Sequence, residues 1–524
     1  MSADQTSDRD LKQILIIWVK QEAPLFLMAF IPIIVLKLAV FHFTASQYLI
    51  IGNMVAVDLS TEWVWIPGFP WFQMNFEVVE AFSDFNFYYM NFVRAFVQGN
   101  LPYTEGLYVY CDPYTSQCAQ TYIYPPLFVY ILGIFYYIPS EFLFPDIQTQ
   151  AIALSVNLDY LRVAFAFIVF DLATCVVMYA AARHLTKNRF IPIVVMLAFA
   201  LNPISIWWGN YLWLSTPIHT FFLVLGFYFM LRGDLRWAVL VATVATMVKQ
   251  TAAILLPLIW FLEYRRGLKQ LFISLGITVA VGLVISMPYL LLYPTAYIDA
   301  LTRGMGAYPF YDTLPAPTYT IPVSVLAFFW PEPFKFIIFS LVSNGIPWLI
   351  CLIFFWIIAY LVPDQPQSAY LEQLLLLALL LSLSAHIFLP RGIYKFYLIA
   401  MIPFLILFGA ILRGPLVPVQ GMSCPLKPRR MKYMAFLPSW MVQFIQQFQD
   451  LSMRIVNNVT TWWFILIGLA SIGIFAVHRF LTHAILLALF FLLLVYGSYH
   501  YVWKWRQRRK ATRENTEDTE KETD

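Results

Sequence analysis

Residues 269–293 read KQLFISLGITVAVGLVISMPYLLLY. After Lys269 the stretch contains no charged side chain, and it is long enough to cross the roughly 30 Å hydrocarbon core of a bilayer as one helix. Only helices and closed barrels satisfy every backbone hydrogen bond in lipid, and barrel strands are short and alternate polar with apolar residues. This uninterrupted apolar run therefore predicts a transmembrane helix.

The composition extends that prediction to the whole chain. The protein has 524 residues, of which 61% are hydrophobic and 12% charged, whereas soluble domains have about 25% charged and 45–50% apolar residues. We therefore predict an all-α polytopic membrane protein with about twelve transmembrane helices. The predicted helices lie near 24–43, 159–182, 190–207, 215–231, 236–248, 251–264, 269–293, 336–362, 372–389, 394–412, 461–478 and 482–502.

The short loops predict the orientation. Cytoplasmic loops are enriched in Lys and Arg. With the N-terminus inside, the loops at 182–189, 231–236, 263–270 and 425–432 are all basic, and only the loop at 362–367 is not. The basic run after residue 503 also falls on the inner side.

The chain is predicted to be organised around one membrane module with long outer loops. The expected divisions are a cytoplasmic N-terminus at 1–23, a transmembrane module at 24–412 with outer loops at 44–158 and 294–335, a cytoplasmic linker at 413–460, a helix pair at 461–503 and a charged cytoplasmic tail at 504–524.

The first outer loop has an unusual distribution of charge. Between 44 and 93 it contains five acidic residues and neither Lys nor Arg. Aromatic segments at 78–98 and 124–138 are typical of helices that lie at the membrane interface. Further along the loop, Cys111 and Cys118 bracket CDPYTSQC and could form a disulfide in an oxidising compartment or remain as thiols.

Four stretches, in this order along the chain, resemble segments of GT-C glycosyltransferases. They are SDFNFYYMNFVRAFVQGNLPY (83–103), YIYPPLFVYILG (122–133), LNPISIWWGN with TMVKQTAAILLPLIWF (201–210 and 246–261) and PRGIYKFYLIAMIP (390–403). They are similar to motifs of the dolichyl-phosphate-mannose mannosyltransferases and of the dolichyl-phosphate-glucose glucosyltransferases. The resemblance implies a hexosyltransferase of the GT-C fold, with mannose ahead of glucose, that uses a polyprenyl- or dolichyl-phosphate sugar.

The resemblance has two departures. Asn86 stands where many mannosyltransferases have a second Asp, and Ile393 and Tyr394 replace a His-Glu pair in the late motif. A divalent metal such as Mg²⁺ or Mn²⁺ is therefore an open alternative rather than an expectation, and no metal ligands are assigned.

Glycosyl transfer needs a base, a positive charge at the leaving phosphate and aligned substrates. Asp84 is the candidate general base of an inverting displacement, although a Ser83-Asp84 helix cap is an alternative role. Arg391 and Lys395 are spaced to share a helix face and are assigned to the carrier phosphate, with snorkelling to the interface as the alternative. The residues assigned to substrate binding are Asn86, Glu80, Arg94, Lys249 and Gln250.

Several of these assignments have competing interpretations. Glu80 could replace Asp84 as the base, because helical spacing places the two on one face. Arg94 could pair with Asp84 or bind phosphate. Lys249, at the tip of a hairpin made by helices 236–248 and 251–264, could instead pair with Asp171.

The expected partners are the lipid-linked sugar donor, a glycolipid or lipid-linked oligosaccharide acceptor, and membrane lipids, with no nucleic acid. The short loops favour an archaeal plasma membrane over the endoplasmic reticulum membrane. A transporter or lipid flippase, which would place charges near the middle of the bilayer, is the main alternative function, and a non-catalytic scaffold is the third.

Overall fold

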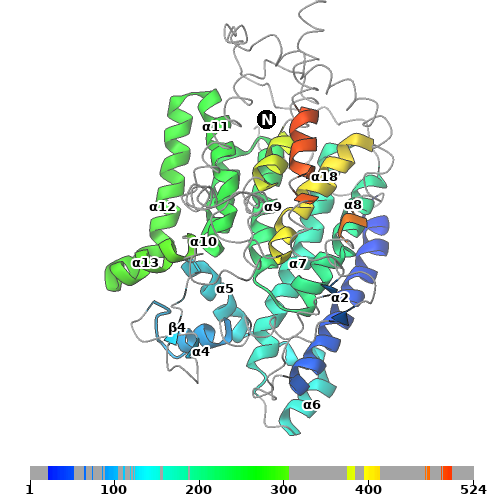
Figure 1. Ribbon diagram of the computed structural model, residues 1–524, viewed down its shortest axis with the longest axis vertical. Coiled ribbons are helices and arrows are strands. Elements are labelled where there is room, and N and C mark those ends of the chain that lie inside the picture. Colours follow the sequence, from blue (N-terminus) through cyan, green and yellow to red (C-terminus); the bar gives the residue numbers. More distant parts are fainter. Residues whose placement is uncertain are drawn as a thin grey trace, which may run out of the picture.

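The computed structural model is predominantly helical (Figure 1). It describes residues 22–51, 64–65, 73–74, 85, 89–103, 110–111, 118–119, 122, 124–153, 157–186, 189–305, 374–383, 395–413, 467, 469–471, 485–486 and 488–497.

Three helices in these ranges are long and apolar enough to cross a membrane. They are α2 (Ala23–Ile51), α7 (Asp159–Leu185) and α12 (Leu268–Leu292). A fourth span is formed if α8 (Ile191–Ala200) and η3 (Ser205–Tyr211), bent by 58°, are counted together. These spans confirm a helical, membrane-embedded protein, while the total of about twelve and the GT-C arrangement stay predictions.

Two predicted helix boundaries were wrong. The helix expected at 24–43 continues to Ile51, so the first outer loop begins after 51 and not at 44. The single helix expected at 190–207 is broken after Ala200, because Pro203 disfavours helical geometry at the preceding Asn202. The Asn202 side chain accepts a hydrogen bond of 3.0 Å from the backbone N–H of Ile204, and the chain resumes as the π-helix η3.

The next two helices pack closely. α9 (Thr216–Arg232) ends at Gly233, whose φ of 82° lets the chain reverse into α10 (Leu235–Val248). At their contact, a Cβ on Gly226 would lie 3.3 Å from the backbone nitrogen of Ala242. The glycine therefore permits the close approach of these two helices.

The hairpin predicted around Lys249 is confirmed. Lys249 has extended backbone angles that end α10, and the chain returns through η4 (Gln250–Leu255) and α11 (Leu256–Arg266). At the open end of the hairpin, the Arg266 guanidinium donates a hydrogen bond of 3.1 Å to the backbone oxygen of Gly233. Lys249 therefore lies at the closed tip.

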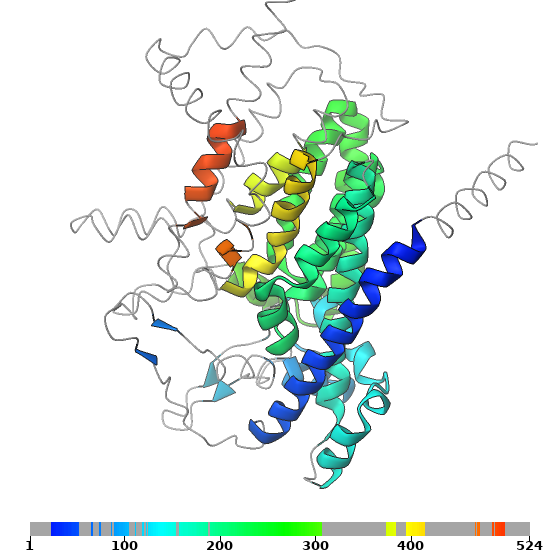
Figure 2. The same ribbon diagram turned by 90° about the vertical axis from the view of Figure 1, so that its right-hand side faces the viewer.

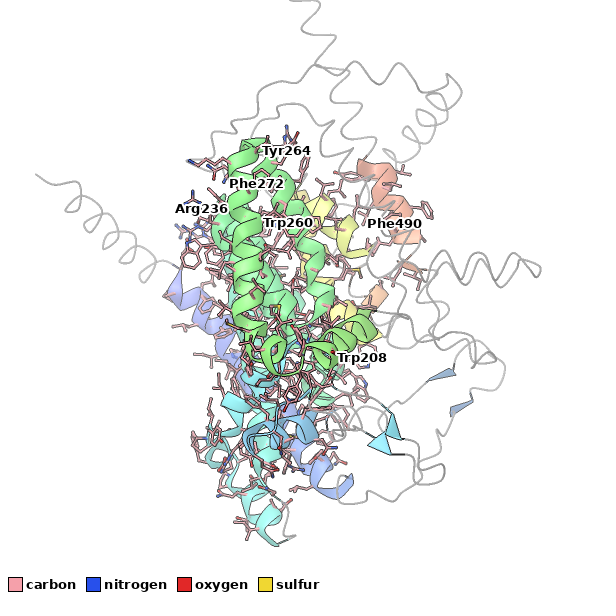
Figure 3. All side chains as sticks on the ribbon, turned by 90° about the vertical axis from the view of Figure 1, so that its left-hand side faces the viewer. Trp208, Arg236, Trp260, Tyr264, Phe272 and Phe490 are labelled. Atoms are coloured by element: carbon pink, nitrogen blue, oxygen red, sulfur yellow. The ribbon has the colours of Figure 1, made fainter. Side chains whose placement is uncertain are left out.

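The described parts of the predicted inner loops at 182–189, 231–236 and 263–270 lie at one end of the bundle, which we call the basic end. There Glu22, before α2, pairs with Arg183 of α7 at 2.6 Å, and the His184 ring contacts the backbone oxygen of Leu231 at 3.2 Å. Figure 3 shows Arg236, Tyr264 and Phe272 near the same end, where α11 turns into α12. The loops thus share a side, as the charge pattern predicted; that this side is cytoplasmic stays a prediction.

The short helices lie at the other end, which we call the Lys249 end (Figures 1 and 2). The predicted interfacial segment at 124–138 is α5, and α13 crosses the end of α12 in Figure 1. The short helices at the Lys249 end are α4 (Asn91–Val97), α5 (Pro126–Tyr136), η2 (Glu141–Leu143), α6 (Pro145–Ala153) and α13 (Pro294–Met305).

Two small antiparallel ladders belong to the first outer loop. They are β1 (Val64–Trp65) with β2 (Gln73–Met74), and β3 (Tyr110–Cys111) with β4 (Cys118–Ala119). In the second ladder Cys111 is the direct partner of Cys118. The backbone therefore places the two predicted disulfide partners opposite each other.

The late helix predicted at 394–412 is η6 (Lys395–Ala400) followed by α18 (Ile402–Arg413). η6 packs against α9, and α18 packs against α7 and α8. The rings of Phe227 in α9 and Phe404 in α18 are centred 5.1 Å apart. Residues 374–383 are helical within the predicted 372–389 segment. The predicted helix at 336–362, the linker at 413–460 beyond Arg413 and the tail at 504–524 lie outside the described residues.

Candidate functional site

Lys249 is the centre of the candidate site. Its side chain is 4% exposed, and its ammonium donates a hydrogen bond of 3.3 Å to the Ser215 hydroxyl. The ammonium also lies 5.9 Å from the centre of the Tyr124 ring, within the range of a cation–π contact. A buried lysine at the break between two helices can present its charge to an anionic group entering from the Lys249 end.

Tyr89 connects the first aromatic segment to this lysine. Its hydroxyl accepts a hydrogen bond of 3.1 Å from the backbone N–H of Ser215. Its ring lies 6.0 Å from that of Tyr124 and 5.1 Å from that of Phe128, in edge-on geometry. Three of the four stretches that carry the family resemblance thus meet here, through Tyr89, Tyr124 and Lys249.

The backbone that delivers Ser215 is strained. Trp213 has a φ of 50°, which is a rare conformation for a bulky residue. The side chain is fully buried, and its ring centre lies 5.0 Å from that of Phe85 and 5.6 Å from that of Phe41. Such outliers persist where the surrounding packing enforces them and are concentrated at functional sites.

A group of tyrosines is connected to the site through Tyr124. Tyr103 donates a hydrogen bond to the backbone oxygen of Tyr124, and the hydroxyls of Tyr297 and Ser286 lie 2.6 Å apart. Burial raises the pKa of Tyr103 well above its usual value, and the neighbouring tyrosines raise it further. These phenols are therefore neutral and act as hydrogen-bonding and stacking groups rather than as bases.

Arg94, a predicted substrate contact, is held by a carboxylate. Its guanidinium binds Asp159 at the start of α7 with two hydrogen bonds of 2.6 and 2.9 Å. The hydrogen bond to Asp159 raises the pKa of Arg94, so the residue stays charged. The structure thus gives Arg94 a role in joining α4 to α7, and its contact with substrate stays a prediction.

The other predicted site residues are placed in part or not at all. Gln250 begins η4 next to Lys249, and the backbone of Lys395 begins η6. η6 packs near this end, since Ile399 and Pro217 both border Gly209. The predicted general base Asp84 lies outside the described residues, as do Asn86, Glu80 and Arg391.

A buried ionic network was missed by the sequence analysis. The Lys37 ammonium of α2 lies 2.9 Å from an Asp171 carboxylate oxygen of α7, and both side chains are fully buried. The Lys249–Asp171 pair suggested as an alternative was wrong, because Asp171 pairs with Lys37. The sequence signal for Lys37 was its position within an otherwise apolar span, where ionisable residues are functional candidates.

Metal ligands were not assigned from the sequence. Within the described ranges, His, Cys, Asp and Glu do not form any cluster of three or more that could hold a metal ion.

Comparison with known proteins adds no relative. No family model matches the chain, and a search of curated proteins finds no match.

Proposed function

We propose that the protein is an integral membrane glycosyltransferase of GT-C type. It would move a hexose, mannose ahead of glucose, from a dolichyl- or polyprenyl-phosphate carrier to a glycolipid or lipid-linked oligosaccharide. The reaction would occur at the Lys249 end, on the outer or lumenal face. An archaeal plasma membrane is favoured over the endoplasmic reticulum membrane.

The proposed chemistry is a single inverting displacement. Asp84 accepts the proton of the acceptor hydroxyl as its oxygen attacks the anomeric carbon. The bond from that carbon to the phosphate oxygen breaks, and the lipid phosphate leaves with one more negative charge. Lys249, Arg391 and Lys395 are the cations assigned to stabilise this charge. Asn86 and Gln250 are assigned to the sugar or acceptor.

The observation that carries the proposal is the environment of Lys249. Three stretches far apart in the sequence contribute Tyr89, Tyr124 and Ser215 around one buried ammonium. An ammonium beside hydroxyls and aromatic faces suits a phosphate joined to a sugar, since the charge binds the phosphate and the rings stack on the sugar. Tyr89, Tyr124 and Lys249 itself lie in three of the stretches that resemble GT-C motifs, whereas Ser215 lies outside them.

The proposal is tested with purified protein in liposomes. A radiolabelled polyprenyl-phosphate mannose is supplied together with a lipid extract as acceptor, and the label is followed into glycolipid. The Asp84→Asn variant should lose transfer while it still binds the donor. A variant that keeps most of its turnover would remove Asp84 as the base. No transfer from either a mannose or a glucose donor by the unaltered protein would refute the proposed function.

A second candidate function is a transporter or lipid flippase. The Lys37–Asp171 pair favours it, because both residues lie near the middle of apolar spans, where transporters place coupled charges. Movement of the labelled lipid across the membrane without a new glycosidic bond would identify this function.

A further inference from the structure

Helix α2 presents one buried stripe to the broken helix η3. Lys37, Phe41 and Tyr48 are spaced so that they lie on one face of α2, and all three are buried. Its neighbour His42 faces elsewhere, toward the exposed carboxylate of Asp146 at 2.6 Å. The stripe therefore belongs to the bundle interior.

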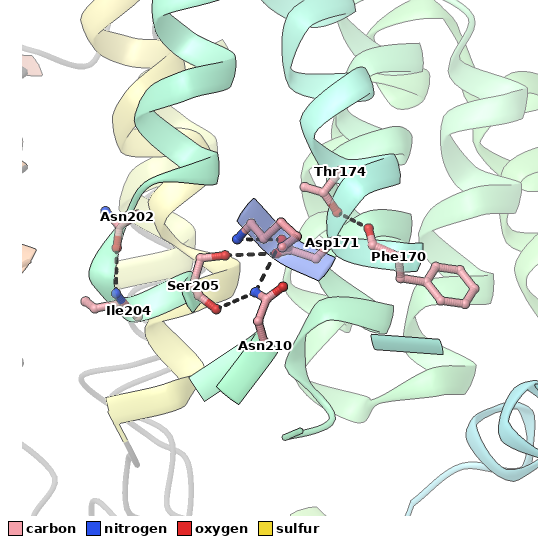
Figure 4. A network of polar contacts seen from close by, with 8 residues as sticks. Phe170, Asp171, Thr174, Asn202, Ile204, Ser205 and Asn210 are labelled. Atoms are coloured by element: carbon pink, nitrogen blue, oxygen red, sulfur yellow. Dashed lines mark hydrogen bonds and ion pairs between the residues drawn. The ribbon is translucent and has the colours of Figure 1, made fainter. Parts of the chain in front are cut away.

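The first contact of the stripe is ionic (Figure 4). Lys37 pairs with Asp171 at 2.9 Å, and the Ser205 hydroxyl donates a hydrogen bond of 2.8 Å to the other oxygen of that carboxylate. The Asn210 amide lies 3.4 Å from Asp171 and donates a hydrogen bond of 2.9 Å to the Ser205 backbone oxygen. Asp171 therefore binds both the first residue of η3 and a residue in its last turn.

The second contact of the stripe is aromatic. The ring of Trp213, just after η3, lies 5.6 Å from Phe41 and 5.3 Å from Tyr48. This packing holds Trp213 at its positive φ, from which the chain continues to Ser215. Ser215 in turn receives the hydrogen bond from Lys249.

We propose that α2 is the positioning element of the Lys249 site, and that the buried Lys37–Asp171 pair is one of its two clamps on η3. Burying two charges is energetically costly, and this pair holds both the first residue and the last turn of the short π-helix. Lys37 and Asp171 are thus positioning residues that act on Lys249 through Ser215. The role of this clamp in catalysis rests on the proposed function, whereas its effect on the position of Lys249 does not depend on that function.

The test measures how accessible Lys249 is to an amine reagent. Protein in detergent is pulsed with acetic anhydride, and acetylation of each lysine is quantified by mass spectrometry. Exposed Lys269, at the basic end, provides the internal reference. In Lys37→Met, acetylation of Lys249 relative to Lys269 should rise at least threefold. The matched control His42→Ala, which changes the exposed pair on the same helix, should leave the ratio unchanged.

The single variant Lys37→Met leaves the charge of Asp171 buried without its partner, and it can therefore fail to fold. The double variant Lys37→Met/Asp171→Leu has neither charge and no acceptor for the Ser205 hydroxyl, and it should keep a Tm close to that of the unaltered protein. It should still show the raised Lys249 ratio, because the clamp is absent. A ratio equal to that of the unaltered protein in this folded double variant would overturn the proposal.

The catalytic consequence is measured separately. If the proposed transfer is observed, the double variant should lower kcat with little change in the KM for the donor, because a displaced Lys249 stabilises the departing phosphate less well. An unaltered protein without transferase activity would refute the proposed function and leave the acetylation result intact. A raised Lys249 ratio with unchanged kcat would show that the clamp does not serve catalysis.

Discussion

The Tyr89 hydroxyl accepts a hydrogen bond of 3.1 Å from the backbone N–H of Ser215, although the two residues are 126 positions apart. This contact fastens the first aromatic segment to the residue that binds Lys249. It also explains why Tyr89 is buried in a segment that the sequence predicts to lie at the membrane interface. The candidate site is therefore part of the packed bundle.

Replacing Lys249 by Met should reduce sugar transfer by about 10²–10³-fold, the usual loss when one group that stabilises a developing negative charge is removed. The reduction should appear in kcat and kcat/KM of the liposome assay. Lys269→Met, at the basic end, is the control and should keep full activity. Equal losses in the two variants would show a general effect on the protein instead.

The Arg94→Ala variant should lower the free energy of unfolding by about 1–3 kcal/mol, because Asp159 is 2% exposed and would lose its two charge-assisted hydrogen bonds. Unfolding is followed by the thermal shift of the detergent-solubilised protein. The exchanged pair Arg94→Asp/Asp159→Arg should recover part of the loss. An unchanged Tm in Arg94→Ala would mean that the Arg94–Asp159 pair is solvated.

The Glu22–Arg183 pair should make stability depend on acid pH. The hydrogen bond from Arg183 lowers the pKa of Glu22 below its usual 4.5. Its contribution to stability is therefore complete above that value and is lost as pH falls through the lower pKa of the folded state. The Tm difference between the unaltered protein and Glu22→Gln should be largest near pH 7 and shrink below about pH 4.5. A difference that grows on acidification would contradict the pairing.

Packing of α9 on α10 should be sensitive to side-chain volume at Gly226. A Cβ there lies 3.3 Å from the Ala242 backbone, so Gly226→Val should overpack the contact and cost about 1–3 kcal/mol of stability. Gly276→Val is the matched control on α12, where a Cβ would meet nothing within 4 Å. The Tm should fall in the first variant and stay within a few degrees in the second. Equal Tm values in the two variants would disprove close packing at Gly226.

Cys111 and Cys118 should form a disulfide in the native membrane. They are direct partners in an antiparallel ladder, where Cα atoms are about 4.5–5.5 Å apart, within the range that a disulfide spans. Mass spectrometry of the unreduced protein should find the linked peptides 2 Da lighter than the reduced pair. Alkylation of both thiols without prior reduction would exclude the bond.

Which segments are helices, and which loops lie together, could be predicted largely from the sequence. Hydropathy located α7, α9, α10 and α12 to within a few residues, because helices in lipid must be continuous and apolar. The spacing of Arg and Lys between them placed the basic loops on one side, as the Arg266–Gly233 and Arg183–Glu22 contacts bear out.

The partners of the polar residues were decided only by the tertiary structure. Lys249 could be placed at a hairpin tip from sequence, but its contact with Ser215 depends on the break at Asn202–Pro203 and on the positive φ of Trp213. Hydropathy is a local property of a segment, whereas the pairing of Lys37 with Asp171 depends on which faces of two helices meet. The sequence by itself determined a helical membrane protein with an acidic, aromatic loop after its first helix; packing decided which of its charges lie together.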